Sequence, residues 1–186
     1  MKPAPEVSTL SLAVLGLISQ QPLSGYDLRK VFSTTPMGHF SMSPGAIYPA
    51  LRRMEASGWV KGSIDRKRKL RPRQLYSLTK KGRLVLARAF ERPVTRDDII
   101  WHMDDLMLRA AFTGSVLGRE KAIAFMKELA SEAEAYVASL RKHLADVSQP
   151  QMIYGRLALE HGLEGYAATA RWARRAAREL EKTKGT

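Results

Sequence analysis

The densest group of side chains able to do chemistry is a run of cations between residues 65 and 73. Six of these nine residues are Lys or Arg, and such groups bind phosphate oxygens through charge-assisted hydrogen bonds. A charge run of this kind is often only a solvated loop. Its meaning therefore depends on the elements beside it.

The charge of the whole chain is as uneven as this run suggests. The 186 residues carry a net charge of +13, and residues 1–95 hold 17 Lys and Arg against 5 Asp and Glu, whereas residues 96–186 hold 14 against 13. Charge that served only solubility would be spread evenly. The surplus in the first half predicts a polyanionic partner, either nucleic acid or an anionic membrane face.

Catalytic and metal-binding signatures are missing from the sequence. It contains no P-loop, no G-x-G-x-x-G, no G-x-S-x-G and no H-E-x-x-H segment, and its four histidines show no ligand spacing. We therefore expect no enzyme, no metal and no cofactor. The four are His39, His102, His143 and His161.

Cysteine usage and hydropathy bear on the compartment. There is no Cys, hence no disulfide framework, and a reducing cytoplasm is expected. The apolar run Leu12 to Ile18 lacks a signal-peptidase site and is interpreted as part of a helix. No segment approaches the length of a membrane span.

The elements of the first half can be placed from their start and stop signals. Ser8 or Thr9 is expected to cap a helix that continues to about Gln20. Ser24 and Asp27 have the spacing of a capping box at the start of a second helix.

A third helix is expected from Ser43 as N-cap, with Pro44 at its first position. Its core-facing stripe is Ile47, Leu51 and Met54. Pro49 would forfeit a backbone hydrogen bond in the second turn and should bend the helix or delay its start. The opposite face shows Gly45, Tyr48, Arg52 and Arg53.

Two short strands are predicted next, at Trp59 to Ile64 and Arg73 to Leu78, with the cationic run between them. A fourth helix capped by Thr79 follows, to about Arg92. Three helices and a two-stranded ribbon are the order of a winged helix-turn-helix, which binds double-stranded DNA. The predicted DNA-binding residues are Ser43, Gly45, Tyr48, Arg52, Arg53, Lys67, Arg68, Lys69, Arg71 and Arg73.

Within this set, different tasks are expected. Ser43, the wing cations Lys67, Arg68 and Lys69, and the amides at the start of the third helix would hold phosphates. Tyr48, Arg52 and Arg53 are the candidates near base edges.

The motifs of residues 10–90 resemble the PadR family of transcriptional regulators. The resemblance rests on the segments Ser43 to Glu55, Gly58 to Val60 and Arg71 to Gly82, with Leu15 to Leu17 and Leu23 to Leu28 upstream. It implies a winged-helix DNA-binding domain, usually in a dimeric repressor relieved by a small molecule or another signal. One difference lies at the wing tip, where Lys67 to Leu70 stand in place of the glycines common in the family.

The second half of the chain predicts long paired helices. A helical stretch is expected from Ile99 to Phe112, ending at Gly114, and two apolar seams follow with steps of three and four residues, separated by Gln149 and Pro150. A hairpin this long cannot bury its whole stripe on a domain of about 90 residues, so self-association into a homodimer is predicted. The alternative is a hairpin packed within its own chain. The predicted dimer residues are Ile123, Met126, Ala130, Val137, Leu140, Leu144, Leu163, Tyr166, Ala170 and Ala173.

The family resemblance is weaker in this half, where longer members carry a helical dimerisation region and Asp104 to Arg109 looks similar. The mainly α-helical chain is thus divided into a winged-helix domain at 1–92 and a dimerisation domain at 93–186. Ordinary packing is preferred for four residues that are also candidates for an effector pocket: Trp101, Met103, Tyr154 and Trp172.

Two other functions remain open at this point. A DNA-coating protein indifferent to sequence would need only the basic wing. A peripheral membrane or scaffold protein would need a long amphipathic helix rich in Lys, whereas the basic cluster here lies on a predicted hairpin.

Overall fold

The computed structural model describes residues 7–40, 44–65, 73–146 and 153–183. The chain divides into two compact units, which are described separately. The first comprises Met1–Arg92 with Ser115–Leu117, and the second comprises Pro93–Gly114 with Gly118–Thr186.

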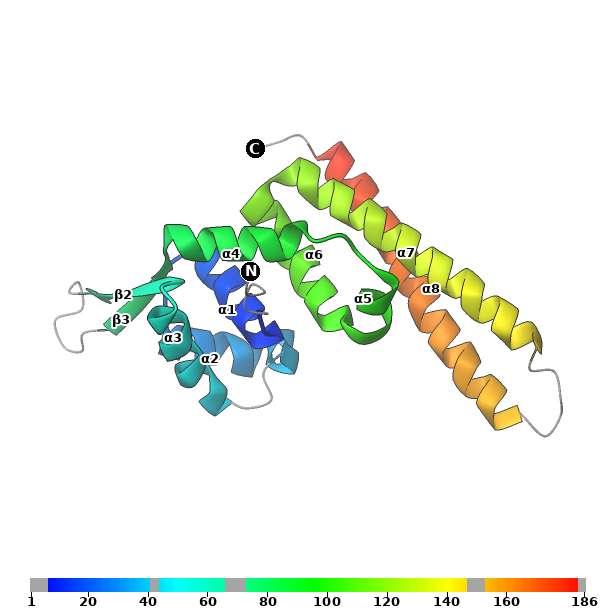
Figure 1. Ribbon diagram of the computed structural model, residues 1–186, viewed down its shortest axis with the longest axis horizontal. Helices are drawn as coiled ribbons and strands as arrows, with labels where there is room; N and C mark the ends of the chain where they lie inside the picture. Colours follow the sequence, from blue (N-terminus) through cyan, green and yellow to red (C-terminus); the bar gives the residue numbers. More distant parts are fainter. Residues whose placement is uncertain (1–6, 41–43, 66–72, 147–152, 184–186) are drawn as a thin grey trace, which may run out of the picture. The chain divides into compact units, whose positions relative to one another are not determined.

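The first unit is a helical domain with a small sheet (Figure 1). Its helices are α1 (Thr9–Gln20), α2 (Gly25–Thr34), α3 (Ile47–Ala56) and α4 (Lys80–Glu91), with short 3-10 turns at Pro36–Phe40 and Pro44–Ala46. Each helix contributes an apolar stripe to one core, in which the largest fully buried side chains include Leu15, Leu28, Ile47, Leu51, Met54, Leu86 and Phe90.

Local capping fixes where these helices begin. Ser8 caps α1, and Ser24 and Asp27 form the predicted capping box at α2. The Thr79 hydroxyl accepts a hydrogen bond from the Gly82 amide at 3.0 Å and donates one to the Gly58 carbonyl at 2.6 Å. Thr79 therefore ties the start of α4 to the turn after α3.

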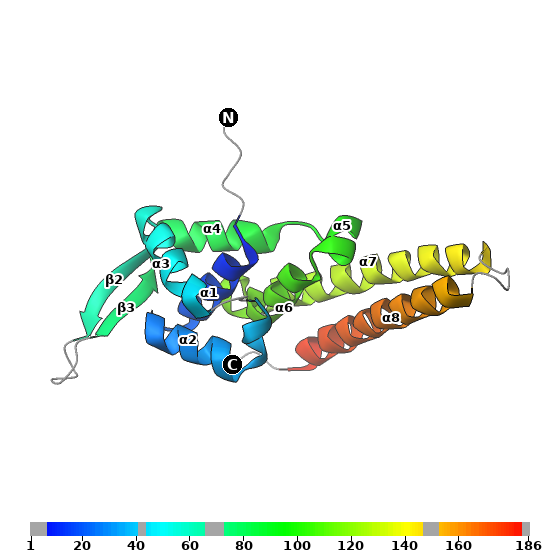
Figure 2. The same ribbon diagram turned by 90° about the horizontal axis from the view of Figure 1, so that it is seen from below.

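The sheet has three strands where the sequence predicted two. Strand β3 (Arg73–Leu78) lies between β2 (Val60–Asp65) and the two-residue β1 (Leu23–Ser24), and both pairings are antiparallel. A strand of two residues has no periodicity that a sequence pattern could reveal. Figure 2 shows the β2–β3 ribbon projecting from the helices, as in a winged helix-turn-helix.

Helix α3 starts later than the sequence suggested. Pro44–Ala46 form a 3-10 turn, and the α-helix begins at Ile47. Pro49 consequently lies in the first α-helical turn, where its missing N–H leaves no intrahelical hydrogen bond unmade. The α-helical start predicted at Pro44 is therefore wrong, whereas the delayed start expected from Pro49 is confirmed; the predicted N-cap, Ser43, lies outside the described residues.

The second unit contains α5 (Arg96–Trp101), α7 (Arg119–Asp146), α8 (Ile153–Lys182) and α6 (Met103–Leu117) except for its last three residues. The single stretch expected from Ile99 to Phe112 is therefore two helices, which separate at His102. Thr95 and Asp98 form a capping box at α5, and α6 ends at Gly118, whose φ of 90° suits glycine.

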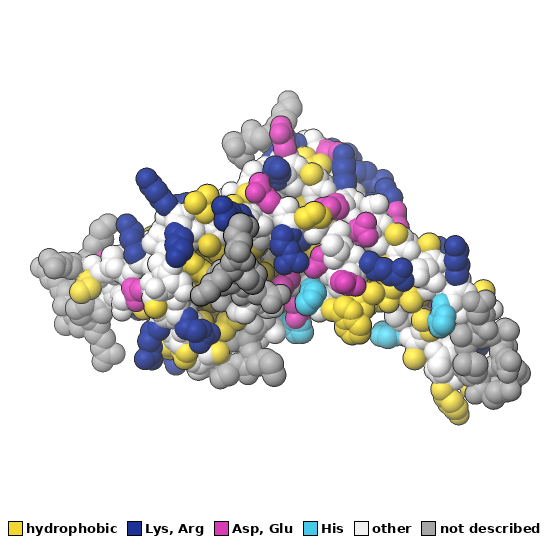
Figure 3. All heavy atoms as spheres, in the orientation of Figure 1, with side chains coloured by type: hydrophobic (Ala, Val, Ile, Leu, Met, Phe, Trp, Pro, Cys, Tyr) yellow, Lys and Arg dark blue, Asp and Glu magenta, His cyan; other side chains and the backbone are white. Residues whose placement is uncertain are grey.

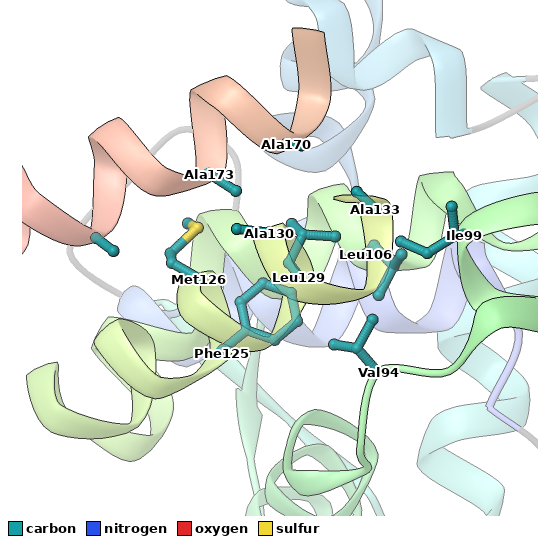
Figure 4. Close-up of a cluster of buried hydrophobic side chains, with 11 residues drawn as sticks. Val94, Ile99, Leu106, Phe125, Met126, Leu129, Ala130, Ala133, Ala170 and Ala173 are labelled. Carbon is teal, nitrogen blue, oxygen red and sulfur yellow. The ribbon is translucent and has the colours of Figure 1, made fainter. Parts of the chain in front are cut away.

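The core of this unit lies where α7 and α8 pack together and where α5 and α6 cover α7. Figure 4 shows side chains from all four helices converging on Leu129, which is fully buried. The contribution of α8 is made by the small residues Ala170, Ala173 and Ala177, so the two long helices approach closely.

Polar contacts fasten the same two helices. The guanidinium of Arg119 donates to the carbonyls of Leu180 and Glu181, both at 2.7 Å. Lys127 pairs with Glu181, and Glu134 with Arg174. Within the described parts of the chain, no helix combines the length and the apolar character needed to cross a membrane.

Candidate nucleic-acid interface

Helix α3 has one buried and one exposed face. Ile47, Ala50, Leu51 and Met54 are buried, whereas Tyr48, Arg52 and Arg53 are exposed together with Gly45 in the preceding turn. Tyr48 and Arg52 are one turn apart and so lie on the same side of the helix. Burial of the apolar stripe therefore presents an aromatic ring and cations to the outside.

A groove runs beside this face of α3. It lies between the start of α2, helix α3 and strand β3, and its lining includes the buried Tyr76. Burial, with a smaller effect from Glu55, raises the pKa of Tyr76 above its ordinary value of 10.0, so its hydroxyl stays protonated at neutral pH. The lining residues are Ser24, Gly25, Tyr26, Tyr48, Arg52, Glu55, Arg73, Gln74 and Tyr76.

Strand β3 forms one wall of this groove, and ionic and aromatic contacts of Arg73 hold it to the start of α2. Arg73 Nη1 lies 3.4 Å from Asp27 Oδ1, and its guanidinium carbon lies 5.4 Å from the centre of the Tyr26 ring. Arg29 approaches the same ring at 5.9 Å. Two cations thus gather around one exposed tyrosine at the start of α2.

Helix α3 is also linked to strand β2 of the ribbon. Glu55 Oε1 accepts a hydrogen bond of 3.0 Å from the amide of Gly62, which pairs with Tyr76 across the sheet. This carboxylate therefore has a structural partner at the edge of a basic surface. Figure 3 shows Lys and Arg side chains around the winged-helix unit with few Asp and Glu side chains beside them.

The predicted DNA-binding residues fall into two groups. Gly45, Tyr48, Arg52, Arg53 and Arg73 are described and lie on α3, on the turn before it or on β3. The other five lie outside the described residues: Ser43, Lys67, Arg68, Lys69 and Arg71.

Three further side chains lie at this groove or beside its wall and were not predicted from the sequence: Tyr26, Arg29 and Gln74. Tyr26 follows directly on the capping serine and glycine of α2. A residue in the first turn of a helix projects near the helix N-terminus, and this position could have indicated Tyr26 from the sequence. Arg29 and Gln74 carry no comparable local signal.

The predicted dimer residues also divide by burial. Met126, Ala130, Ala170 and Ala173 are buried within a single chain, and Val137 is 5% exposed. Their contacts in the structure are intramolecular, and a role in a dimer stays a prediction. Those that remain partly exposed are Ile123, Leu140, Leu144, Leu163 and Tyr166.

The four candidates for an effector pocket do not form one pocket. Tyr154 and Trp172 are 18 residues apart on α8, which corresponds to about 27 Å along the helix axis. Met103 and Trp172 instead pack beside the core of the second unit, while Trp101 is 75% and Tyr154 84% exposed. Among the described residues, no three His, Asp or Glu side chains are placed to hold a metal ion.

Comparison with known families matches both units. Residues 14–88 match the model of the transcriptional regulator PadR-like family, and residues 104–181 match a model described as virulence activator alpha C-term. Residues 14–88 are therefore a PadR-like family domain. Such transcriptional regulators are typically not enzymes.

Among curated proteins, the negative transcriptional regulator PadR of Bacillus subtilis is 27% identical over 139 residues, which is 71% of either chain. Solved PadR structures from Bacillus subtilis include a complex with operator DNA and a complex with p-coumaric acid. The former is 22% identical with a TM-score of 0.40 and covers 91% of this chain and 97% of its own; the latter is 23% identical with a TM-score of 0.39 and covers 97% and 99%. A PadR-like regulator from Bacillus cereus is 27% identical with a TM-score of 0.41, covering 97% and 99%.

Proposed function

We propose that this PadR-like regulator is a homodimeric repressor that binds DNA in a sequence-specific manner and is released by a small molecule or another signal. The observation that carries the proposal is the exposed face of α3. Because Ile47, Leu51 and Met54 are buried, this helix would enter a major groove with the exposed face that carries Tyr48, Arg52 and Arg53.

Recognition of a site is divided between two elements in this proposal. Arg52 and Arg53 reach base edges, because a guanidinium can bind guanine through two hydrogen bonds. Arg73 and the cations of residues 66–71 bind phosphates, which orients the protein without reading sequence. The first unit is thus the DNA-binding domain.

Repression is supported by the Bacillus subtilis relative, which is named as a negative regulator. A repressor of this type needs only to occupy its operator. We therefore expect deletion of the gene to raise transcription from the promoter that the protein binds.

Self-association of the second unit is supported by large apolar side chains that stay exposed in the single chain. Ile153, Tyr154 and Leu157 are 37%, 84% and 51% exposed at the start of α8, and Figure 3 shows hydrophobic surface at this end of the helix. A two-fold partner would bury them and present two recognition helices about 34 Å apart.

A candidate effector site lies in the second unit, between α5 and α7. Arg96, Lys142 and His143 line a groove there with the ring of Tyr136. The Arg96 guanidinium donates to Ser139 Oγ at 2.8 Å and lies 5.2 Å from the Tyr136 ring centre. This lining suits an anionic compound with a flat ring.

The effector proposal can be tested by calorimetric titration with p-coumaric acid as the probe. Saturable binding that Arg96→Gln abolishes, together with loss of operator binding in wild type, is expected. Binding unaffected by Arg96→Gln would move the site elsewhere. If no small carboxylate releases the protein from its operator, the regulating signal must be of another kind.

The first experiment is selection of genomic DNA fragments by the purified protein at about physiological salt, where non-specific binding is weak. An inverted repeat with half-sites about 10 base pairs apart is expected. Enrichment of no sequence above background would favour the alternative, a DNA coater indifferent to sequence.

A further inference from the structure

The ring of Tyr48 on α3 rests directly on the backbone of Gly25 on α2. A Cβ atom built on Gly25 would lie 2.5 Å from Tyr48 Cε1, 3.1 Å from Cζ and 3.2 Å from Cδ1. Ordinary van der Waals contact begins at about 3.4 Å. The ring therefore occupies the space in which any other residue at position 25 would place its side chain.

The backbone itself does not require glycine at this position. Gly25 is the first residue of α2, directly after the capping Ser24, and the positive φ angles among the described residues belong to Gly58 and Gly118. Alanine would fit this backbone, and it loses less conformational entropy on folding than glycine does. The close approach of the Tyr48 ring is thus the local reason for glycine.

The contact restricts a side chain that is only half-buried. Tyr48 is 42% exposed, and both it and Gly25 line the groove beside Arg52. A ring seated on one side has fewer rotamers to lose when it meets DNA, and such preorganisation raises affinity without any new contact.

We propose that Gly25 is a positioning residue for DNA recognition: it seats the Tyr48 ring of the recognition helix, although it does not itself touch DNA. The proposal rests on the proposed DNA-binding function. It predicts that a single methyl group on α2 lowers operator affinity while the fold is retained, because the displaced atoms are the far end of a half-exposed side chain.

The test compares Gly25→Ala with Gly165→Ala. Gly165 is an exposed glycine within α8, and a Cβ there meets nothing within 4 Å, so this control adds the same methyl group without moving a ring. Both variants should melt no lower than wild type. Only Gly25→Ala should weaken binding to the inverted repeat selected by wild type, by about fivefold or more, the lower end of what loss of one specific contact costs.

A double-mutant comparison separates displacement of the Tyr48 ring from other effects of the methyl group at position 25. Tyr48→Ala should also weaken binding, and adding Gly25→Ala to it should cause no further loss, because no ring remains to be displaced. Unchanged operator affinity in Gly25→Ala, or losses that add up in the double variant, would overturn the proposal.

A measurement without DNA tests the contact between Gly25 and the Tyr48 ring separately from the proposed DNA-binding function. Protein labelled with fluorotyrosine gives a 19F resonance for each of six tyrosines, and the Tyr48 signal is the one that Tyr48→Phe removes. It should shift in Gly25→Ala and not in Gly165→Ala, and an unmoved signal would refute the seat. If wild type selects no DNA sequence, the proposed function fails, whereas the 19F shift still decides where the ring sits.

Discussion

Asp27 at the start of α2 and Arg73 at the start of β3 form an ion pair, with 3.4 Å between Oδ1 and Nη1. The same carboxylate accepts hydrogen bonds from the amide and the hydroxyl of Ser24, at 3.1 and 2.7 Å. One side chain therefore caps a helix and anchors the root of the wing. The helix cap and the anchor of the wing both depend on the first turn of α2, where the Tyr48 ring packs against Gly25.

Replacement of Asp27 by Ala should destabilise the first unit by about 1 kcal/mol, mainly through loss of the cap. The ion pair adds little to stability because both side chains are about one-third exposed. Urea denaturation measures the change. Arg73→Gln, which keeps the cap, should leave stability nearly unchanged, and equal losses in both variants would contradict this division.

Arg52 and Lys69 should differ in how they affect DNA binding. Arg52→Ala should cost about 1–3 kcal/mol on the selected operator and much less on unrelated duplexes. Lys69→Ala should weaken all duplexes similarly and lower the salt dependence by about one counterion. Fluorescence anisotropy at several salt concentrations distinguishes the two. Equal losses on all duplexes for both would indicate the sequence-indifferent binder.

Gly82→Ala should strongly destabilise the first unit. A Cβ on Gly82 would lie 1.9 Å from the carbonyl oxygen of Trp59, which itself accepts the Thr79 amide at 3.0 Å. Backbone on both sides must move, so we expect a loss of about 1–3 kcal/mol. Gly155→Ala in α8, where a Cβ meets nothing, should not lose stability. Equal stability of the two variants would be unexpected.

Acid should weaken the α7–α8 pairing through Glu134. Hydrogen bonding to Arg174 holds the pKa of Glu134 below its ordinary value of 4.5. The pair therefore contributes fully above that value, and its contribution is lost as the pH falls through the lowered pKa. Thermal melts from pH 7 to pH 3 should show a smaller acid-induced drop for Glu134→Gln than for wild type. Parallel curves would show that the pair contributes nothing.

Tyr154 and Leu157 should control the oligomeric state. Changing both to Ser removes apolar surface that the single chain leaves uncovered, so we expect dissociation to monomers in sedimentation experiments and weaker operator binding. Leu84→Ser alters a side chain in the first unit that is 60% exposed and should leave the assembly intact. A dimer that persists in the double variant would place the interface elsewhere.

Sequence reasoning succeeded where one side chain acts on its own stretch of backbone. The hydroxyls of Ser24 and Thr79 cap α2 and α4 as predicted. These signals depend on neighbours within a few residues, so they can be identified without a tertiary structure.

The sequence could not show which surface an apolar seam meets. The spacing of Met126, Ala130, Ala170 and Ala173 predicts two apolar faces. The same pattern serves a hairpin within one chain and a contact between two chains. The seat of Tyr48 on Gly25 is equally invisible in the sequence, since it depends on how closely α2 and α3 approach.

Arg119, the first residue of α7, binds the last turn of α8. The ion pairs of Lys127 with Glu181 and of Glu134 with Arg174 hold the two helices in the same alignment farther along α7. One residue inserted or deleted between these points would rotate everything beyond it by about 100° and separate the partners. Within residues 119–186, length variation among related chains should therefore be confined to the segment joining the two helices and to the residues beyond Lys182. The same limits apply to a tag or a sensor domain inserted into this hairpin.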